Sequence, residues 1–173
     1  MIVVADAGPL LALAKTDGLG VLFRLYPKIY SPPAVYEEVV TAGHRLSAPD
    51  AAIVEECFRS GHLELSEPTR ASLPVSRELG RGEEEGIRLA LQKGADWLLM
   101  DDLDARRAAE ACFRAAGAGT RVQGTLGVIV SAYQQNHLGR LEAIEIVERL
   151  NQRLDVWISP ALCRRVIDLL KEG

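Results

Sequence analysis

Several carboxylates stand at points where a folded chain would gather them. Asp6 follows the apolar run 2–5, and Asp101 follows a second apolar run, 97–100. Three consecutive glutamates open the segment that leads into the second run, and a further acidic pair stands earlier in the chain. The candidate acids are Asp6, Glu37, Glu38, Glu83, Glu84, Glu85, Asp101 and Asp102.

Carboxylates that share one cleft repel each other unless they are protonated or hold a divalent cation. Mg²⁺ and Mn²⁺ take oxygen ligands, and Mg²⁺ keeps bound waters, one of which can serve as a nucleophile. The chemistry that suits such a site is phosphodiester hydrolysis. Taken singly, each acid also has a structural explanation, because Asp6, Asp101 and Asp102 could cap turns or helices and glutamates suit a helix N-terminus.

The elements around these acids predict where they meet. Short β-branched runs alternate with amphipathic segments, which predicts an α/β fold of three layers, α/β/α, with a central, mainly parallel sheet. The carboxyl ends of parallel strands share one edge, where ligands bind in such folds. The strands are expected at 2–5, 28–31, 63–65, 97–100 and 120–123, and a helix at 34–41 is followed by a loop at 43–49. Residues 156–158 are expected to form a brief strand or a packed connector.

Composition indicates one soluble domain. The 173 residues predict a single domain, 1–173, with C-terminal helices at 141–173 packed on it, and no run reaches the roughly 20 apolar residues of a membrane span. We expect a cytoplasmic protein, since the apolar N-terminal run lacks the basic flank of a secretory signal. A net charge of −4 argues against wrapping duplex nucleic acid through charge alone, and three widely spaced cysteines predict neither disulfides nor a zinc site.

Other catalytic motifs are missing or incomplete. The chain has no ATP-binding P-loop and no nucleophile elbow of the G-x-S-x-G type. The sequence Asp102-Leu103-Asp104 after a strand leaves open a phosphatase with an aspartyl nucleophile, but it is not on the first strand and lacks the expected following Gly-Thr. Basic residues near the acids, namely Lys15, Arg106 and Arg107, could contact phosphate or belong to solvated helix faces.

Five segments in order resemble the PIN-domain nucleases, and among them the VapC-like toxins of prokaryotic toxin–antitoxin pairs. The similarity covers roughly residues 2–158. The segments are Val4-Ala5-Asp6-Ala7-Gly8-Pro9-Leu10-Leu11-Ala12-Leu13-Ala14, Pro32-Pro33-Ala34-Val35-Tyr36-Glu37-Glu38-Val39, Gly82-Glu83-Glu84-Glu85-Gly86-Ile87, Leu98-Leu99-Met100-Asp101-Asp102-Leu103-Asp104-Ala105-Arg106 and Gly124-Thr125-Leu126-Gly127-Val128.

The resemblance implies a parallel sheet, an acidic pocket for Mg²⁺ or Mn²⁺, and cleavage of single-stranded or structured RNA. It also implies a homodimer and a cognate antitoxin that blocks the pocket. By position, the implied catalytic acids are Asp6, Glu38, Glu83, Asp101 and Asp102, with Asp6, Glu83 and Asp101 as metal ligands. The register leaves Glu37, Glu84, Glu85 and Asp102 as alternates, and either Glu38 or Asp102 would orient the attacking water.

One position departs from the family pattern. Many PIN domains carry a serine or threonine after the first aspartate, whereas this chain has Ala7. The hydroxyl is therefore missing from that place, or Thr125 supplies it. Two hypotheses of different classes follow: a metal-dependent endoribonuclease, and a catalytically weak PIN-like module that binds RNA or a protein partner.

Overall fold

A five-stranded parallel sheet forms the centre of the molecule. The computed structural model describes residues 1–70, 73 and 79–172. The strands, in the sheet order β3-β2-β1-β4-β5, are β1 (Val3–Ala5), β2 (Ile29–Ser31), β3 (Leu63–Leu65), β4 (Trp97–Leu99) and β5 (Arg121–Gln123). All four neighbouring pairs are parallel. The predicted α/β fold with a mainly parallel sheet is confirmed.

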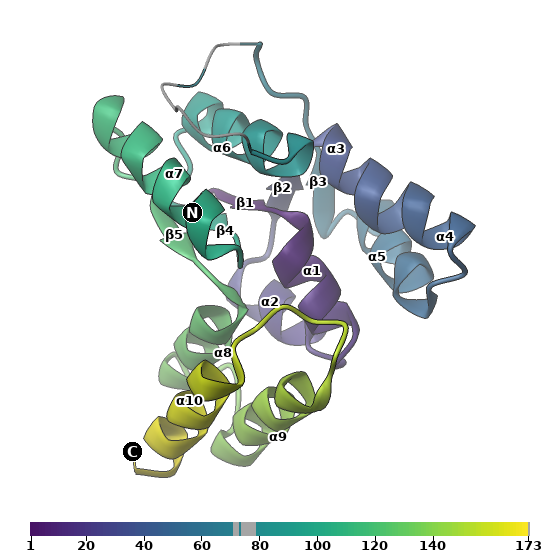
Figure 1. The fold of residues 1–173 in the computed structure, drawn as a ribbon, viewed down its shortest axis with the longest axis vertical. Coiled ribbons are helices and arrows are strands. Elements are labelled where there is room, and N and C mark those ends of the chain that lie inside the picture. Colours follow the sequence, from purple (N-terminus) through teal and green to yellow (C-terminus); the bar gives the residue numbers. More distant parts are fainter. Residues whose placement is uncertain (71–72, 74–78, 173) are drawn as a thin grey trace.

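Helices cover both faces of this sheet (Figure 1). They are α1 (Ala7–Ala14), α2 (Leu19–Leu25), α3 (Pro33–Tyr36), the π-helix η1 (Glu37–Ala42), α4 (Gly43–Arg45), α5 (Pro49–Arg59), α6 (Arg81–Lys93), α7 (Leu103–Ala115), α8 (Thr125–Gln134), α9 (Arg140–Gln152) and α10 (Pro160–Glu172). None of the helices within the described ranges is both long and apolar enough to cross a membrane.

Successive side chains of each strand point to opposite faces of the sheet, so the helices pack in a layer on each face. On β1, Val3 and Ala5 pack into the cluster formed with α1, α2, α5 and the C-terminal helices, whereas Val4 packs with α6 and α7. On β4, Leu99 packs into the first of these clusters and Leu98 into the second. The central strand β1 is buried on both faces and β4 nearly so, as their continuous apolar runs predict, whereas the edge strands β3 and β5 are partly exposed.

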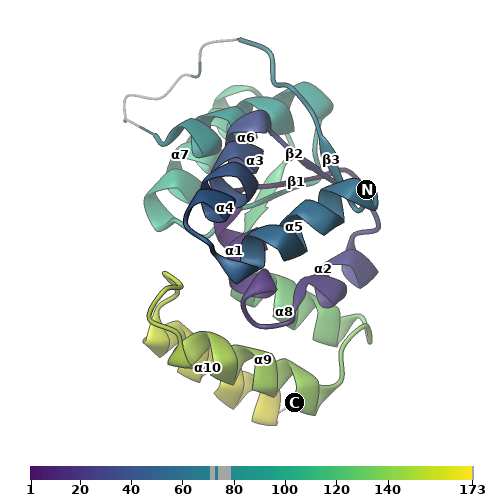
Figure 2. The same ribbon diagram turned by 90° about the vertical axis from the view of Figure 1, so that its right-hand side faces the viewer.

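The last three helices gather beside this core (Figure 2). The α9 and α10 helices pack on each other, and both contact α8. The segment between α9 and α10 contains no strand, so residues 156–158 form the connector. It is tied to the end of α1, where Lys15 Nζ pairs with Asp155 Oδ2 at 3.0 Å. That the whole chain is one domain stays a prediction.

The loop predicted at 43–49 is shorter in the structure, where it spans only residues 46–48. The residues after the helix expected at 34–41 do not leave it: α3 runs into η1, and α4 continues to Arg45. The π-helical segment contains Glu38. Because wider π-turns alter which side chains share a helix face, a pattern of 3.6 residues per turn could not place Glu37 and Glu38.

Candidate active site

The strand order places two acids on either side of a switch in chain direction. From β1 the chain moves outward to β2 and β3, then returns to lay β4 on the other side of β1. In open α/β sheets, the crevice at such a switch point is the usual ligand site. Asp6 follows β1 and Asp101 follows β4, and the Asp6 N–H donates to the Leu99 carbonyl at 3.0 Å. The two acids therefore lie at neighbouring strand ends, as expected.

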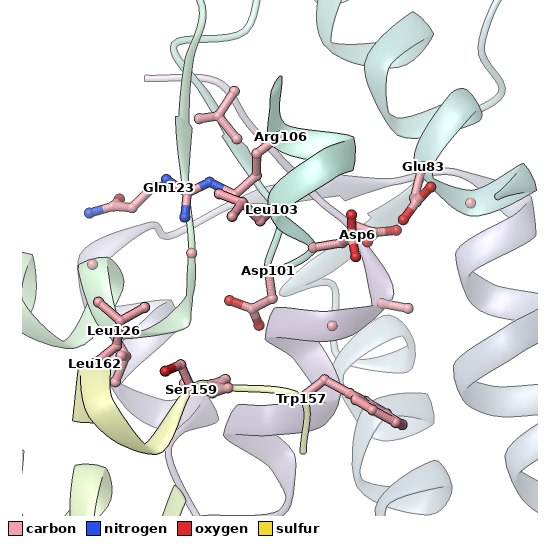
Figure 3. Close-up of a pocket in the computed structure, with 18 of the residues that line it drawn as sticks. Asp6, Glu83, Asp101, Leu103, Arg106, Gln123, Leu126, Trp157, Ser159 and Leu162 are labelled. Carbon is pink, nitrogen blue, oxygen red and sulfur yellow. The ribbon is translucent and has the colours of Figure 1, made fainter. Parts of the chain in front are cut away.

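A large cleft opens at this edge, with a volume of about 1020 Å³. Its acidic members are Asp6, Glu38, Glu83, Asp101 and Asp102. Figure 3 shows Asp6 between Glu83 and Asp101, with Trp157, Ser159 and Leu162 from the C-terminal segment on the facing wall. All five candidate catalytic acids thus line one cleft.

Asp6 is the most buried of these acids, with 8% of its surface exposed. It stands at the N-terminus of α1 with extended backbone and caps no helical N–H through its side chain. Burial raises the pKa of the Asp6 carboxyl to about 7, against the opposing effect of the Ala7 backbone N–H. The carboxylates of Glu38, Glu83 and Asp101 also raise this pKa, so the four groups sense each other electrostatically.

Glycines leave room for these carboxylates to approach. A Cβ on Gly82 would lie 3.3 Å from Asp6 Oδ1 and 3.5 Å from Glu38 Oε2. Both oxygens therefore border the same small space above α6. Burial raises the pKa of Glu38, and the nearby Glu83 raises it further. A cation placed in this space would relieve the repulsion between the two carboxylates.

Asp101 is held by the start of α8. Its Oδ1 accepts the Thr125 backbone N–H at 2.7 Å, and its Oδ2 accepts the Thr125 hydroxyl at 2.6 Å. Burial raises the pKa of Asp101, while these hydrogen bonds and the nearby Arg106 oppose the rise. Because Thr125 is fully buried and its hydroxyl donates to Asp101, this hydroxyl positions that acid. That it also makes up for the hydroxyl missing at Ala7 stays a prediction.

The three glutamates of α6 have three different surroundings. Glu83 lines the cleft and accepts the Gly80 N–H at 2.8 Å. Glu84 pairs with Arg88, whereas Glu85 pairs with Arg81 and accepts the Ala34 N–H. Of the three, the structure brings only Glu83 to the other acids.

The remaining alternates have structural partners. Glu37 pairs with Arg81 at 2.7 Å and does not line the cleft, in contrast to Glu38. Asp102 lines the cleft, but its Oδ1 caps α7 by accepting the Ala105 N–H at 2.7 Å. Of the two residues considered for orienting water, Glu38 therefore has the carboxylate that is free of a capping role.

The carboxylate oxygens of the cleft suit a hard divalent cation, although they are not arranged as a complete coordination shell. Within residues 1–70, 73 and 79–172, no three acidic side chains stand ready to coordinate one ion together. Mg²⁺ commonly binds through one or two carboxylates and keeps several waters. Four mutually repelling carboxylates with a glycine-lined space fit that mode of binding, with Asp6, Glu83 and Asp101 as candidate ligands.

The second wall of the cleft is apolar, and the sequence did not indicate it. Leu126 and Val130 from α8 face the connector and α10, which contribute Trp157, Leu162 and Val166. Trp157 is 94% exposed. Nothing in the local pattern of residues 156–166 distinguishes this wall from a packed helix, because its place depends on how α10 returns across α8. Lys15, one of the basic residues considered either as a phosphate contact or as part of a solvated helix face, pairs with Asp155.

A comparison with protein families identifies the family of this chain. Residues 2–172 match the family DUF3368, described as a PIN domain. Among solved structures, the chain is similar to a PilT N-terminus domain protein from the hyperthermophilic archaeon Sulfolobus solfataricus, with 14% identity and a TM-score of 0.46. That similarity covers 76% of this chain and 93% of the archaeal one. The search of curated proteins found no match. Because the family match spans nearly all of its residues, the chain belongs to the PIN domain family, whose members are generally nucleases.

Proposed function

We propose that this chain is an endoribonuclease that uses Mg²⁺ or Mn²⁺ to hydrolyse phosphodiester bonds in single-stranded or structured RNA. The observation that carries the proposal is the buried Asp6 carboxylate, whose pKa is raised by burial and by three further acids of one cleft. A divalent cation would keep these acids ionised at neutral pH, which is the state in which they can bind it.

Asp6, Glu83 and Asp101 would hold the ion, and Glu38 would orient the attacking water. The ion would lower the pKa of that water and stabilise the charge that develops on the phosphate. Glu38, whose raised pKa makes it a better proton acceptor, would take the proton of the water. The water oxygen then bonds to phosphorus, the phosphorus–oxygen ester bond breaks, and the leaving oxygen is protonated from solvent.

The cleft favours unpaired RNA over a duplex. One end is acidic, and the facing wall is largely apolar, with the exposed Trp157 at its rim. Aromatic and apolar side chains stack well on bases that are not paired. The net charge of −4 gives the protein little general attraction for duplex phosphates.

We further propose that the enzyme is the toxin of a toxin–antitoxin pair, acts in the cytoplasm as a homodimer and is blocked by its cognate antitoxin. The resemblance to VapC-like toxins supports this role. Expression without the antitoxin should stop growth, and Asp6→Asn should restore growth at equal protein level. Normal growth with the active enzyme would refute the toxin role, and light scattering tests the dimer.

The test of the enzyme is cleavage of an end-labelled, single-stranded RNA in Mn²⁺, in Mg²⁺ and in EDTA. Glu38→Gln and Glu37→Gln form a matched pair, since only Glu38 lines the cleft. We expect cleavage that requires the metal, a loss of about 100-fold in Glu38→Gln and near-normal cleavage in Glu37→Gln. Equal cleavage in EDTA would eliminate the metal mechanism.

Two observations favour the alternative, a catalytically weak PIN-like module that binds RNA or a protein partner. In the described part of the chain the acids are not preassembled around an ion, and both oxygens of Asp101 are engaged by Thr125. Such a module would bind the RNA without cutting it and would gain no thermal stability from Mn²⁺. A thermal-shift titration with Mn²⁺ separates the two functions.

A further inference from the structure

An arginine in the wall of the cleft has a buried nitrogen that finds no hydrogen-bond partner among the described residues. Arg106 lies on α7 and lines the cleft. Its Nε is buried and makes no hydrogen bond to any residue that the structure describes. Leaving a buried donor of a charged group unpaired is costly, and such groups in native proteins call for an explanation. A ligand in the cleft is one explanation that the position of Arg106 suggests.

Arg106 lies beside Asp101 without a direct ion pair to it in the described structure. A Cβ on Gly124 would lie 2.9 Å from Asp101 Oδ1 and 3.4 Å from Arg106 Nη1, so both groups border the space that this glycine leaves. The charge of Arg106 lowers the pKa of Asp101. In the view of Figure 3, Arg106 and Gln123 lie at one end of the cleft and Glu83 at the other, with Asp6 and Asp101 between them.

The neighbouring cations differ from Arg106. Arg81 also lines the cleft, but it is held by ion pairs to Glu37 and Glu85. Arg107, the next residue, points to the outside of α7 and pairs with Asp104 at 3.5 Å. Arg106 is thus a cationic group of the cleft lining for which the described residues provide no ion pair.

A cleft that collects carboxylates repels a phosphodiester unless a cation offsets the repulsion. The planar guanidinium group presents several N–H donors that match the oxygens of phosphate. We propose that Arg106 binds the phosphodiester group that is cut and holds a non-bridging oxygen beside Asp101. This inference rests on the proposed function and names the group that holds the substrate phosphate.

The experiment compares Arg106→Gln and Arg106→Lys with Arg107→Gln, which removes the same charge one residue away and outside the cleft. The measurements are kcat and KM on single-stranded RNA with Mn²⁺, together with the affinity for Mn²⁺ alone. We expect Arg106→Gln to lower kcat/KM by about 100-fold and to retain Mn²⁺ binding. Arg106→Lys should recover part of the loss, because lysine keeps the charge without the fork of donors.

Three results would overturn the inference. Equal kcat/KM in Arg106→Gln and Arg107→Gln would remove any special role of Arg106 while leaving the proposed nuclease intact. If Arg106→Gln lost both Mn²⁺ binding and cleavage, Arg106 would act by positioning the acids and not by binding the phosphate. If Arg106→Gln does not fold, a wild-type kcat/KM in Arg106→Lys would contradict the inference, because it would show that the guanidinium donors do not hold the phosphate. Absence of cleavage by the wild type is a different outcome, since it refutes the proposed function itself.

Discussion

Replacing Asp6 with asparagine should stabilise the metal-free protein at neutral and alkaline pH. Asparagine has nearly the same shape as aspartate and carries no charge at any pH. In the wild type, Asp6 has a pKa of about 7 when folded and an ordinary value of 3.8 as reference. An ionised carboxylate buried beside other acids is unfavourable, so removing its charge relieves the fold.

The direction and size of this change in the free energy of unfolding follow from proton linkage. Below pH 3.8, Asp6 is protonated in both states and its raised pKa changes nothing with pH. Between 3.8 and about 7 the folded state keeps a proton that the unfolded state has lost, so the free energy of unfolding falls as pH rises. The full effect is about 4 kcal/mol, complete above pH 7. From pH 5 to pH 8 the wild type should lose about 2.5 kcal/mol more than Asp6→Asn.

The assay is urea unfolding in EDTA at several pH values from 5 to 8. Asp168→Asn, which removes an exposed carboxylate from α10, serves as the control. In thermal melts of a protein of this size, the same difference corresponds to about 5–10 °C. Parallel pH dependence of wild type and Asp6→Asn over this range would show that Asp6 is ionised without cost, and would refute the reasoning.

Three further substitutions probe the cleft. Gly82→Ala should change the free energy of unfolding by less than about 1 kcal/mol, because the higher helix propensity of alanine offsets crowding against Asp6 and Glu38. It should nevertheless abolish the rise in melting temperature that Mn²⁺ causes. The control Gly86→Ala should keep that rise, because its Cβ would make only ordinary contact with Leu98. Thr125→Val should cost about 1.5–3 kcal/mol in urea unfolding at pH 7.5 by removing the hydroxyl that Asp101 accepts, whereas Thr125→Ser should restore most of it. Trp157→Ala should leave stability unchanged, since the side chain is 94% exposed, but weaken binding of single-stranded RNA by about 10-fold or more in a fluorescence anisotropy titration.

The meeting of Asp6 and Asp101 could be predicted from the sequence for a specific physical reason. Each follows a short run of apolar residues that is buried on both faces, and parallel strands end at a common edge. The sequence did not reveal that β4 lies directly beside β1. That pairing makes the acids neighbours, and it depends on contacts between segments more than 90 residues apart, such as the register of Ala5 with Leu99.

Part of the choice among the glutamates could have been predicted from the sequence, and part could not. Arg88 stands four residues after Glu84 and Arg81 four before Glu85, so the helical ion pairs that occupy these two glutamates could have been expected from spacing. The π-helical turns around Glu38 could not, because no simple pattern in the sequence specifies them.

The apolar wall and the burial of the Arg106 Nε atom beside the cleft could also not be predicted from local sequence. Both depend on where α7, α8 and α10 lie relative to the sheet edge. A solvated arginine and an arginine at the wall of a cleft have the same helical spacing. The roles of the acids themselves stay predictions that chemistry must test.

Calorimetric titration of the metal-free protein with Mn²⁺ at pH 7.5 measures whether the acids of the cleft bind one cation together. If Asp6 and the acids around it form one cation site, the wild type should bind Mn²⁺ in the cleft with a measurable heat, and Asp6→Asn should bind it at least about 10-fold more weakly. No uptake of Mn²⁺ by the wild type, or equally tight binding by Asp6→Asn, would contradict a cation site formed by these acids.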